Sequence, residues 1–166
     1  NENFVVGADI STAMLQAARA KIARAGRERS SALVATAAES LAFVSNQFDI
    51  VTVAFGVRNF SDRDAGLAEM CRVLRPGGRA LILEFGLPEN GFVRSVYLAY
   101  FRVILPAIAA IFSRQGEAYR YLNRSVEAFP DTETFCGALK RAGFQRIAVQ
   151  RLTFGIANLY IAYKTH

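Results

Sequence analysis

The sequence has few of the residues that metal centres and nucleophilic hydrolases need. Its 166 residues include two cysteines, Cys71 and Cys136, and a single histidine, His166, at the last position. Two cysteines so far apart exclude a disulfide scaffold, and with one imidazole they exclude a Cys/His zinc site. The same shortage argues against a Cys–His or Ser–His–Asp catalytic apparatus. We therefore expect no metal site.

The sequence also lacks a long uninterrupted apolar run and a strong excess of one charge. Residues 92–112 are apolar and aromatic, but Arg94 and Arg102 interrupt them and Pro106 breaks them, which argues against a membrane span. The net charge of +6 favours anionic partners in general. Because the basic residues are scattered and no nucleic-acid motif appears, we expect no nucleic-acid partner. The 52% hydrophobic content predicts a folded domain with a sizeable core.

The first half of the chain alternates apolar strands with amphipathic helices. Strands are predicted at residues 4–8, 32–36, 48–55 and 79–85, and helices at 11–26 and 62–74. The runs at 4–8 and 48–55 are so apolar that both strands are predicted to be buried. Pro76, Gly77 and Gly78 predict a tight turn at 75–78 between helix and strand. This alternation predicts an α/β protein with a mostly parallel, doubly wound sheet.

The second half departs from this alternation. A helical insertion is predicted at about 90–128, with one or two helices over 92–112 and another over 115–126. A helix at 132–142 follows, and strands at 146–153 and 156–163 form an antiparallel hairpin around Gly155. No linker or repeat divides the chain, so we expect one domain over residues 1–166.

Ligands bind beyond the carboxyl ends of the strands in open parallel sheets, so the residues after each strand are the candidate site. Asp9, after the first strand, has a carboxylate that suits the two hydroxyls of a ribose. The alternative is that Asp9 or Ser11 caps the following helix. The segments 37–39, 56–59 and 84–86 follow the other strands and are predicted to converge on the same rim.

Arg58 and Asn59 are the sharpest candidates at this rim. Arg58 supplies a charged, planar set of donors, and Asn59 supplies a donor and an acceptor. The alternative is a surface salt bridge, but Gly56 permits close approach of the backbone and favours a site. Tyr119 and Tyr121 either line an aromatic pocket or pack with their hydroxyls in water. Both cysteines fit helical apolar patterns and are predicted to be core residues.

The residues at 48–91 strongly resemble the ubiquinone/menaquinone biosynthesis C-methyltransferases, the UbiE family. The resemblance rests on FG-x-RN-x-x-D at 55–62, RVLRPGG at 72–78 and LEF at 83–85. It extends to both ends of the chain through GADIS-x-x-ML at 7–15, EAYRYL-x-x-S at 117–125, FPD at 129–131 and LTFGIANLYIAYK at 152–164. The resemblance implies a Rossmann-like class I methyltransferase fold and S-adenosylmethionine as the cofactor.

The resemblance also implies a reaction, the C-methylation of a polyprenylated quinol, either a demethylmenaquinol or a methoxy-polyprenyl-benzoquinol. It places Arg58 and Asn59 at the chemistry, with Glu84, Tyr119 and Tyr121 as weaker substrate-binding candidates. Because the pKa of arginine stays above about 12, Arg58 is expected to stabilise a phenolate or orient a water rather than act as a base. The cofactor-binding residues implied are Asp9, Ile10, Met14, Ala37, Ala38, Phe55 and Gly56.

The sequence departs from the family pattern at three positions. Ala37 stands where the family usually has an Asp that meets the adenine, so we expect backbone contact at Ala38 instead. Phe154 and Tyr160 stand where the family tends to have Gly and His. These departures keep open a methyltransferase of the same fold that acts on another small molecule.

The family's first strand and Gly-rich loop are expected to precede Asn1, so we interpret the chain as an N-terminally incomplete domain. That strand would lie between the strands at 4–9 and 48–55, and its absence would leave two apolar edges unpaired. A truncated, non-enzymatic remnant is the second alternative. We expect a cytoplasmic protein with a lipid-tailed substrate, and we leave open a homodimer and a peripheral contact with the inner membrane face.

Overall fold

The computed structural model describes residues 4–86, 91, 95, 121, 124–126 and 128–165. A two-stranded parallel sheet consists of β1 (Val5–Asp9) and β2 (Ser31–Ala35), connected by α1 (Thr12–Arg24) and the short 3₁₀ helix η1 (Glu28–Ser30). Ser11 begins α1 as predicted, because its hydroxyl accepts a hydrogen bond from the Met14 amide at 3.3 Å.

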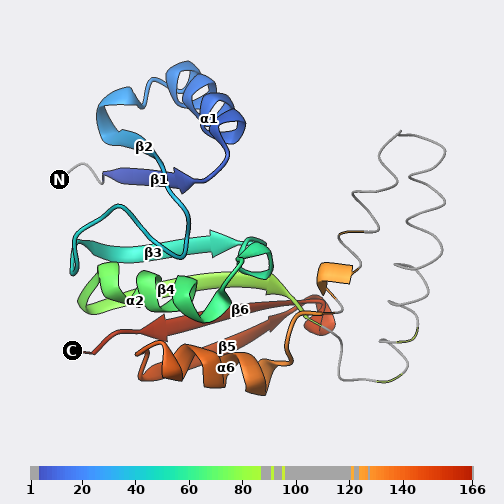
Figure 1. Ribbon diagram of the computed structural model, residues 1–166. Helices are drawn as coiled ribbons and strands as arrows, with labels where there is room; N and C mark the ends of the chain where they lie inside the picture. The colour runs from blue at the N-terminus through green and yellow to red at the C-terminus, as the bar shows by residue number, and fades with distance from the viewer. Residues whose placement is uncertain are drawn as a thin grey trace, which may run out of the picture.

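A second, four-stranded sheet follows in the order β3-β4-β6-β5 (Figure 1). Its strands are β3 (Phe48–Ala54), β4 (Leu74–Phe85), β5 (Arg146–Leu152) and β6 (Ala157–Tyr163). Strands β3 and β4 are parallel, whereas β6 runs antiparallel to both β4 and β5. The structure confirms the predicted α/β class and the antiparallel C-terminal hairpin.

The core lies between the second sheet and two helices, α2 (Arg63–Val73) and α6 (Thr132–Arg141), that cover one of its faces. Leu67 and Met70 of α2 are buried in this core, and Leu67 is fully inaccessible. Phe135 of α6 meets Tyr160 of β6 edge-on, with ring centroids 4.7 Å apart. Cys71 is buried in this core as predicted, and burial raises the pKa of its thiol.

The predicted burial of the strands at 4–8 and 48–55 is wrong. Phe4 and Val5 are each 62% exposed, and Ile50 is 45% exposed. The reason is the pairing: within the described residues, β1 pairs only with β2, and β3 pairs only with β4. Each strand therefore keeps one open edge, and its apolar side chains lack a neighbour on that side.

Two turns also differ from expectation. The turn predicted at 75–78 lies inside β4 as a bulge. Phe48 pairs with Leu74 and Ile50 pairs with Arg79, so β4 uses five residues where β3 uses two, and the extra residues form the bulge. The hairpin between β5 and β6 turns through a 3₁₀ segment, η4 (Thr153–Gly155), where Phe154 has a positive φ of 57°. Most of the predicted insertion lies outside the described residues. No described helix is long and apolar enough to cross a membrane.

Candidate active site

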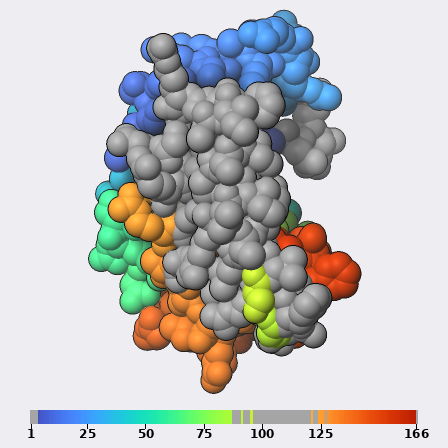
Figure 2. Space-filling view, turned by 90° about the vertical axis from the view of Figure 1, so that its right-hand side faces the viewer, coloured from blue at the N-terminus to red at the C-terminus, as the bar shows by residue number. Residues whose placement is uncertain are grey.

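The carboxyl ends of β1, β3 and β4 point to the same side of the molecule (Figure 1). Parallel pairing accounts for this agreement within each sheet, between β1 and β2 and between β3 and β4. Figure 2 views the molecule from that side, with the N-terminal segments at one end and the α6 segment at the other. The predicted convergence of the strand ends on one rim is therefore confirmed for these three strands.

Ser11 is the N-cap of α1, and Asp9 supports the turn that precedes it. One carboxylate oxygen, Oδ1, accepts a hydrogen bond from the Ser11 amide at 2.8 Å, which turns the chain into α1. A carboxylate accepts several hydrogen bonds, so this turn leaves acceptor capacity for a ligand. Ile10 directly follows Asp9, and Met14 lies in the first turn of α1; they are 75% and 60% exposed and so offer apolar surface.

The segment after β2 brings Ala37 and Ala38 to the same place. The Thr36 amide donates a hydrogen bond to the Asp9 carbonyl at 3.1 Å, so the end of β2 is fastened to the end of β1. Ala37 and Ala38 are half-buried in the turn that follows. Neither side chain can form a hydrogen bond, so their backbone groups are the polar groups that they offer a ligand.

At the end of β3 the backbone is strained. Phe55 has a φ of 55°, a region that an aromatic residue rarely adopts. Its ring stacks on Phe85 at the end of β4, with centroids 4.4 Å apart. Gly56 follows, and a Cβ there would lie 2.8 Å from the Val53 side chain, so glycine is required for this tight exit. Such strain is found at functional sites, where surrounding packing enforces it.

The strained backbone after β3 places Arg58 next to a buried carboxylate. Arg58 lies in the 3₁₀ helix η2 (Val57–Asn59), and its Nη1 is 3.1 Å from Oε2 of Glu84. The Arg58 backbone N–H also donates to Oε1 of Glu84, at 3.2 Å. The two side chains are only 11% and 1% exposed. Glu84, a weak substrate-binding candidate from the sequence, is thus the buried partner of Arg58.

The guanidinium of Arg58 has a buried donor without a partner. Its Nη1 is bound to Glu84, but its Nε is buried and has no hydrogen-bond partner among the described residues. Phe55 and Phe85 place their rings 5.9 and 5.2 Å from the guanidinium carbon. A buried N–H without a partner is costly, so the positive charge of Arg58 is only partly compensated by the described residues around it.

Asn59 is also engaged at the rim. Its Oδ1 accepts a hydrogen bond from the Tyr121 hydroxyl at 2.8 Å, which joins the predicted insertion to the candidate site. Tyr121 is 53% exposed, so its ring is not buried in the core. Tyr119 lies outside the described residues. Tyr160, by contrast, is 1% exposed, so this departure from the family pattern is a core residue.

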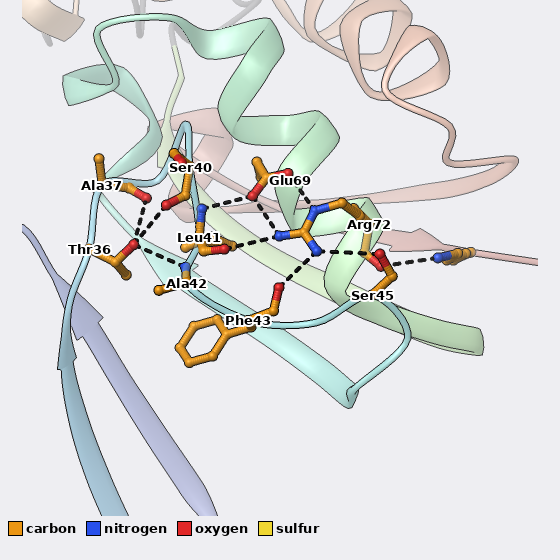
Figure 3. A network of polar contacts seen from close by, with 10 residues as sticks. Thr36, Ala37, Ser40, Leu41, Ala42, Phe43, Ser45, Glu69 and Arg72 are labelled. Carbon is orange, nitrogen blue, oxygen red and sulfur yellow. Dashed lines mark hydrogen bonds and ion pairs between the residues drawn. The ribbon is translucent and has the colours of Figure 1, made fainter.

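Sequence reasoning missed a polar network behind the rim that involves Glu69 and Arg72. Figure 3 shows Arg72 and Glu69 of α2 bound to one another and to the segment after β2. The Arg72 guanidinium lowers the pKa of Glu69, so this pair stays ionised at neutral pH. The stability gained from that shift is present above the ordinary pKa of glutamate and is lost as the pH falls through the lowered value. The sequence signal that could have identified Arg72 was its place in the family segment RVLRPGG.

Within the part of the chain that the structure describes, no group of His, Cys, Asp and Glu side chains is arranged to hold a metal ion. The polar groups described at the rim include the Asp9 carboxylate, backbone amides, the Arg58 guanidinium and the Asn59 carboxamide. These groups suit an organic ligand with hydroxyl and amino groups.

Comparison with known proteins identifies relatives over nearly the whole chain. The ubiE/COQ5 methyltransferase family matches residues 1–164. The demethylmenaquinone methyltransferase of Bacteroides fragilis is 38% identical over 160 residues, which are 96% of this chain and 65% of that protein. The ubiquinone/menaquinone biosynthesis C-methyltransferase UbiE of a Marinomonas strain is 41% identical over 164 residues, 99% of this chain and 65% of that protein. The chain thus spans just under two thirds of each relative.

Solved structures with the same fold have lower sequence identity. A SAM-dependent methyltransferase from Aquifex aeolicus matches with a TM-score of 0.66 and 16% identity, over 96% of this chain and 68% of that one. The [4+2]-cyclase SpnF matches with a TM-score of 0.71 and 15% identity, over 100% of this chain and 68% of that one. These likenesses confirm the Rossmann-like methyltransferase fold.

The Arg58–Glu84 pair generates a prediction about stability. Replacing Glu84 alone by Ala leaves the Arg58 charge buried and unpaired, so we expect a loss of about 3–5 kcal/mol in the free energy of unfolding. Replacing both residues by Met removes both charges and fills the space, so the double variant is expected to lose less than the single one. Urea unfolding measures both losses. A double variant less stable than Glu84→Ala would contradict the assignment of a buried ion pair.

Proposed function

The chain belongs to the ubiE/COQ5 methyltransferase family, and from that premise we propose that it transfers a methyl group from S-adenosylmethionine to a ring carbon of a polyprenylated quinol. The observation that carries the proposal is the Arg58 guanidinium, fixed by buried Glu84 and with a charge only partly compensated by the described residues around it. Asp9 lies on the same rim. The substrate class comes from the relatives' names, which specify demethylmenaquinone and ubiquinone/menaquinone biosynthesis.

The residues at the end of β1 fit the adenosine part of the proposed cofactor. The Asp9 carboxylate has acceptor capacity for the ribose hydroxyls beyond its bond to Ser11. The exposed side chains of Ile10 and Met14 offer the apolar contact that a purine ring needs. The backbone of Ala37 and Ala38 would meet the edge of that purine, and Phe55 and Gly56 would border it from the second sheet.

S-adenosylmethionine, when bound, supplies an electrophilic methyl group on a positively charged sulfur. A ring carbon of a quinol attacks such a group well only when a ring hydroxyl has lost its proton. Arg58 would stabilise that phenolate oxygen through the charge of its guanidinium, because Glu84 holds this group in place before the substrate arrives. Transfer would join the ring carbon to the methyl group as the bond from sulfur to methyl breaks, and the ring carbon would then lose its proton to water.

Asn59 would orient the quinol rather than exchange a proton with it. A carboxamide does not titrate, and its Oδ1 already accepts a hydrogen bond from Tyr121. A guanidinium offers donors and no acceptor, so water is the acceptor that we propose for the phenolic proton. Tyr119 and Tyr121 remain predicted contacts of the ring, and peripheral membrane contact, a cytoplasmic location and a homodimer also stay predictions.

We further propose that an additional parallel strand lies between β1 and β3. The support is that both strands have an open edge and exposed apolar residues, and that each relative contains residues beyond those matched here. In a strand, successive amides point to opposite edges, so a strand with one partner protects only every second amide from exchange. Hydrogen exchange of the intact protein is expected to show protection at successive amides of both strands. Protection at alternate amides would refute this proposal.

The proposed function assigns cofactor binding to Asp9, after β1, and catalysis to Arg58, after β3. Asp9→Asn keeps an oxygen for the Ser11 amide but loses the charge, so we expect the Kd for S-adenosylhomocysteine to rise about tenfold or more. Arg58→Ala is expected to lower kcat at least about 100-fold while changing that Kd little. Calorimetric titration and methyl-transfer assays on demethylated quinols measure the two effects.

Two further variants make this test decisive. Asp49→Asn is the matched control, because Asp49 is 72% exposed and pairs with Arg75 away from the rim; its Kd should equal that of the unmodified protein. Arg58→Lys keeps the charge and guards against a loss of folding in Arg58→Ala. Equal losses of affinity and turnover in both Arg58 variants would make Arg58 a cofactor-binding residue instead. No binding of S-adenosylhomocysteine by the unmodified protein would refute the proposed function.

A further inference from the structure

The segment between the two sheets, residues 36–47, has no regular secondary structure but carries the two residues proposed to meet the purine. We call it the connecting loop. Ala37 and Ala38 offer only backbone groups to a ligand, and a backbone group recognises a base only if its position is fixed. The conformation of the connecting loop therefore determines whether this half of the site exists.

The loop is held from outside by a single arginine on α2. Arg72 donates from Nη1 to the Phe43 carbonyl at 2.8 Å and from Nη2 to the Leu41 carbonyl at 3.0 Å (Figure 3). Its Nε and Nη2 also bind the two oxygens of Glu69. Glu69 in turn accepts a hydrogen bond from the Leu41 amide at 2.7 Å. The Glu69–Arg72 pair thus satisfies donors and acceptors of the same short segment.

Two further residues, Thr36 and Glu39, connect the loop to the rim through four hydrogen bonds. Thr36 closes the first turn of the loop, because its hydroxyl donates to the Ser40 carbonyl at 2.8 Å and accepts from the Ala42 amide at 3.2 Å. Glu39 accepts hydrogen bonds from the Ser61 and Asp62 amides, at 2.6 and 3.3 Å, at the start of α2. The alanines at 37 and 38 therefore lie between one anchor on β1 and others on α2.

We propose that Glu69 and Arg72 are positioning residues for purine recognition: they hold the connecting loop so that the backbone of Ala37 and Ala38 meets the edge of the adenine. This inference rests on the proposed function. It explains how the chain recognises adenine with alanine at both positions, because side chains outside the site supply the rigidity that a direct side-chain contact would otherwise supply. Neither Glu69 nor Arg72 needs to touch the cofactor.

The test compares two nucleosides in the intact protein. Adenine accepts a hydrogen bond at N1 and donates from its amino group, whereas hypoxanthine donates at N1 and accepts at O6. A fixed backbone edge should therefore bind S-adenosylhomocysteine at least about tenfold more tightly than S-inosylhomocysteine. Arg72→Gln is expected to weaken binding of S-adenosylhomocysteine about tenfold and to remove most of this preference. Calorimetric titration gives all four constants.

Matched variants separate a positioning role from a general loss of structure. Arg141→Gln is the matched control, because it also breaks a contact between an arginine and a carboxylate of α2, the exposed one of Arg141 with Asp64 at 3.4 Å. This contact does not involve the connecting loop, so the variant should keep the preference for S-adenosylhomocysteine over S-inosylhomocysteine. Glu69→Gln is the milder variant if Arg72→Gln folds poorly. Arg72→Lys should restore the preference only in part, because an ammonium cannot reproduce the planar set of donors.

The outcomes distinguish this inference from the function on which it rests. If the unmodified protein binds neither nucleoside, both the positioning role and the proposed function are refuted. If it prefers adenosine and Arg72→Gln and Glu69→Gln keep that preference, the positioning role is refuted while the proposed function stands. If both variants weaken the two ligands equally, so that the ratio is unchanged, the pair supports the fold alone and the inference is again refuted.

Discussion

The guanidinium of Arg72 holds the connecting loop, on which the arrangement of the two sheets depends. The two sheets are covalently joined only through residues 36–47, and this segment has no regular structure of its own. Arg72 and Glu69 fasten the middle of the loop to α2, and Lys164 donates to Asn46 at 2.8 Å near its end. The nucleoside half of the rim therefore takes its position from a helix of the other sheet.

The other half of the rim is held by burial and strain rather than by a network of surface bonds. Phe55 adopts a positive φ, Gly56 allows the tight exit from β3, and Arg58 ends on the inaccessible carboxylate of Glu84. These features fix the guanidinium before any ligand arrives. Preorganised charge of this kind stabilises a developing anion without reorganisation, which is what formation of a phenolate requires.

Much of this arrangement was predictable because local patterns determined it. The apolar strands, the Ser11 cap and the polar residues after each strand are local features of the sequence. Parallel pairing then brings the carboxyl ends of β1 and β2 together, and those of β3 and β4. The burial of β1 and β3 was not predictable from their composition, because burial depends on which strands pair with them.

The partners of the charged residues were also not predictable from the sequence. Arg58 was identified, but its pairing with Glu84 spans 26 residues, and the contact of Arg72 with Leu41 spans 31. No short pattern encodes such contacts. Phe154 shows a related limit: its positive φ explains why the family favours glycine there, but this backbone conformation could not be predicted from the aromatic residue at that position.

The central claim is that one nucleoside site spans the ends of both sheets. Hydrogen exchange of the intact protein with and without S-adenosylhomocysteine tests it most directly, because it reports each segment separately. The account predicts that exchange slows together at residues 10–11 after β1, at 37–39 in the connecting loop and at 56–58 after β3. Slower exchange confined to one sheet, or unchanged exchange at all three segments, would contradict it.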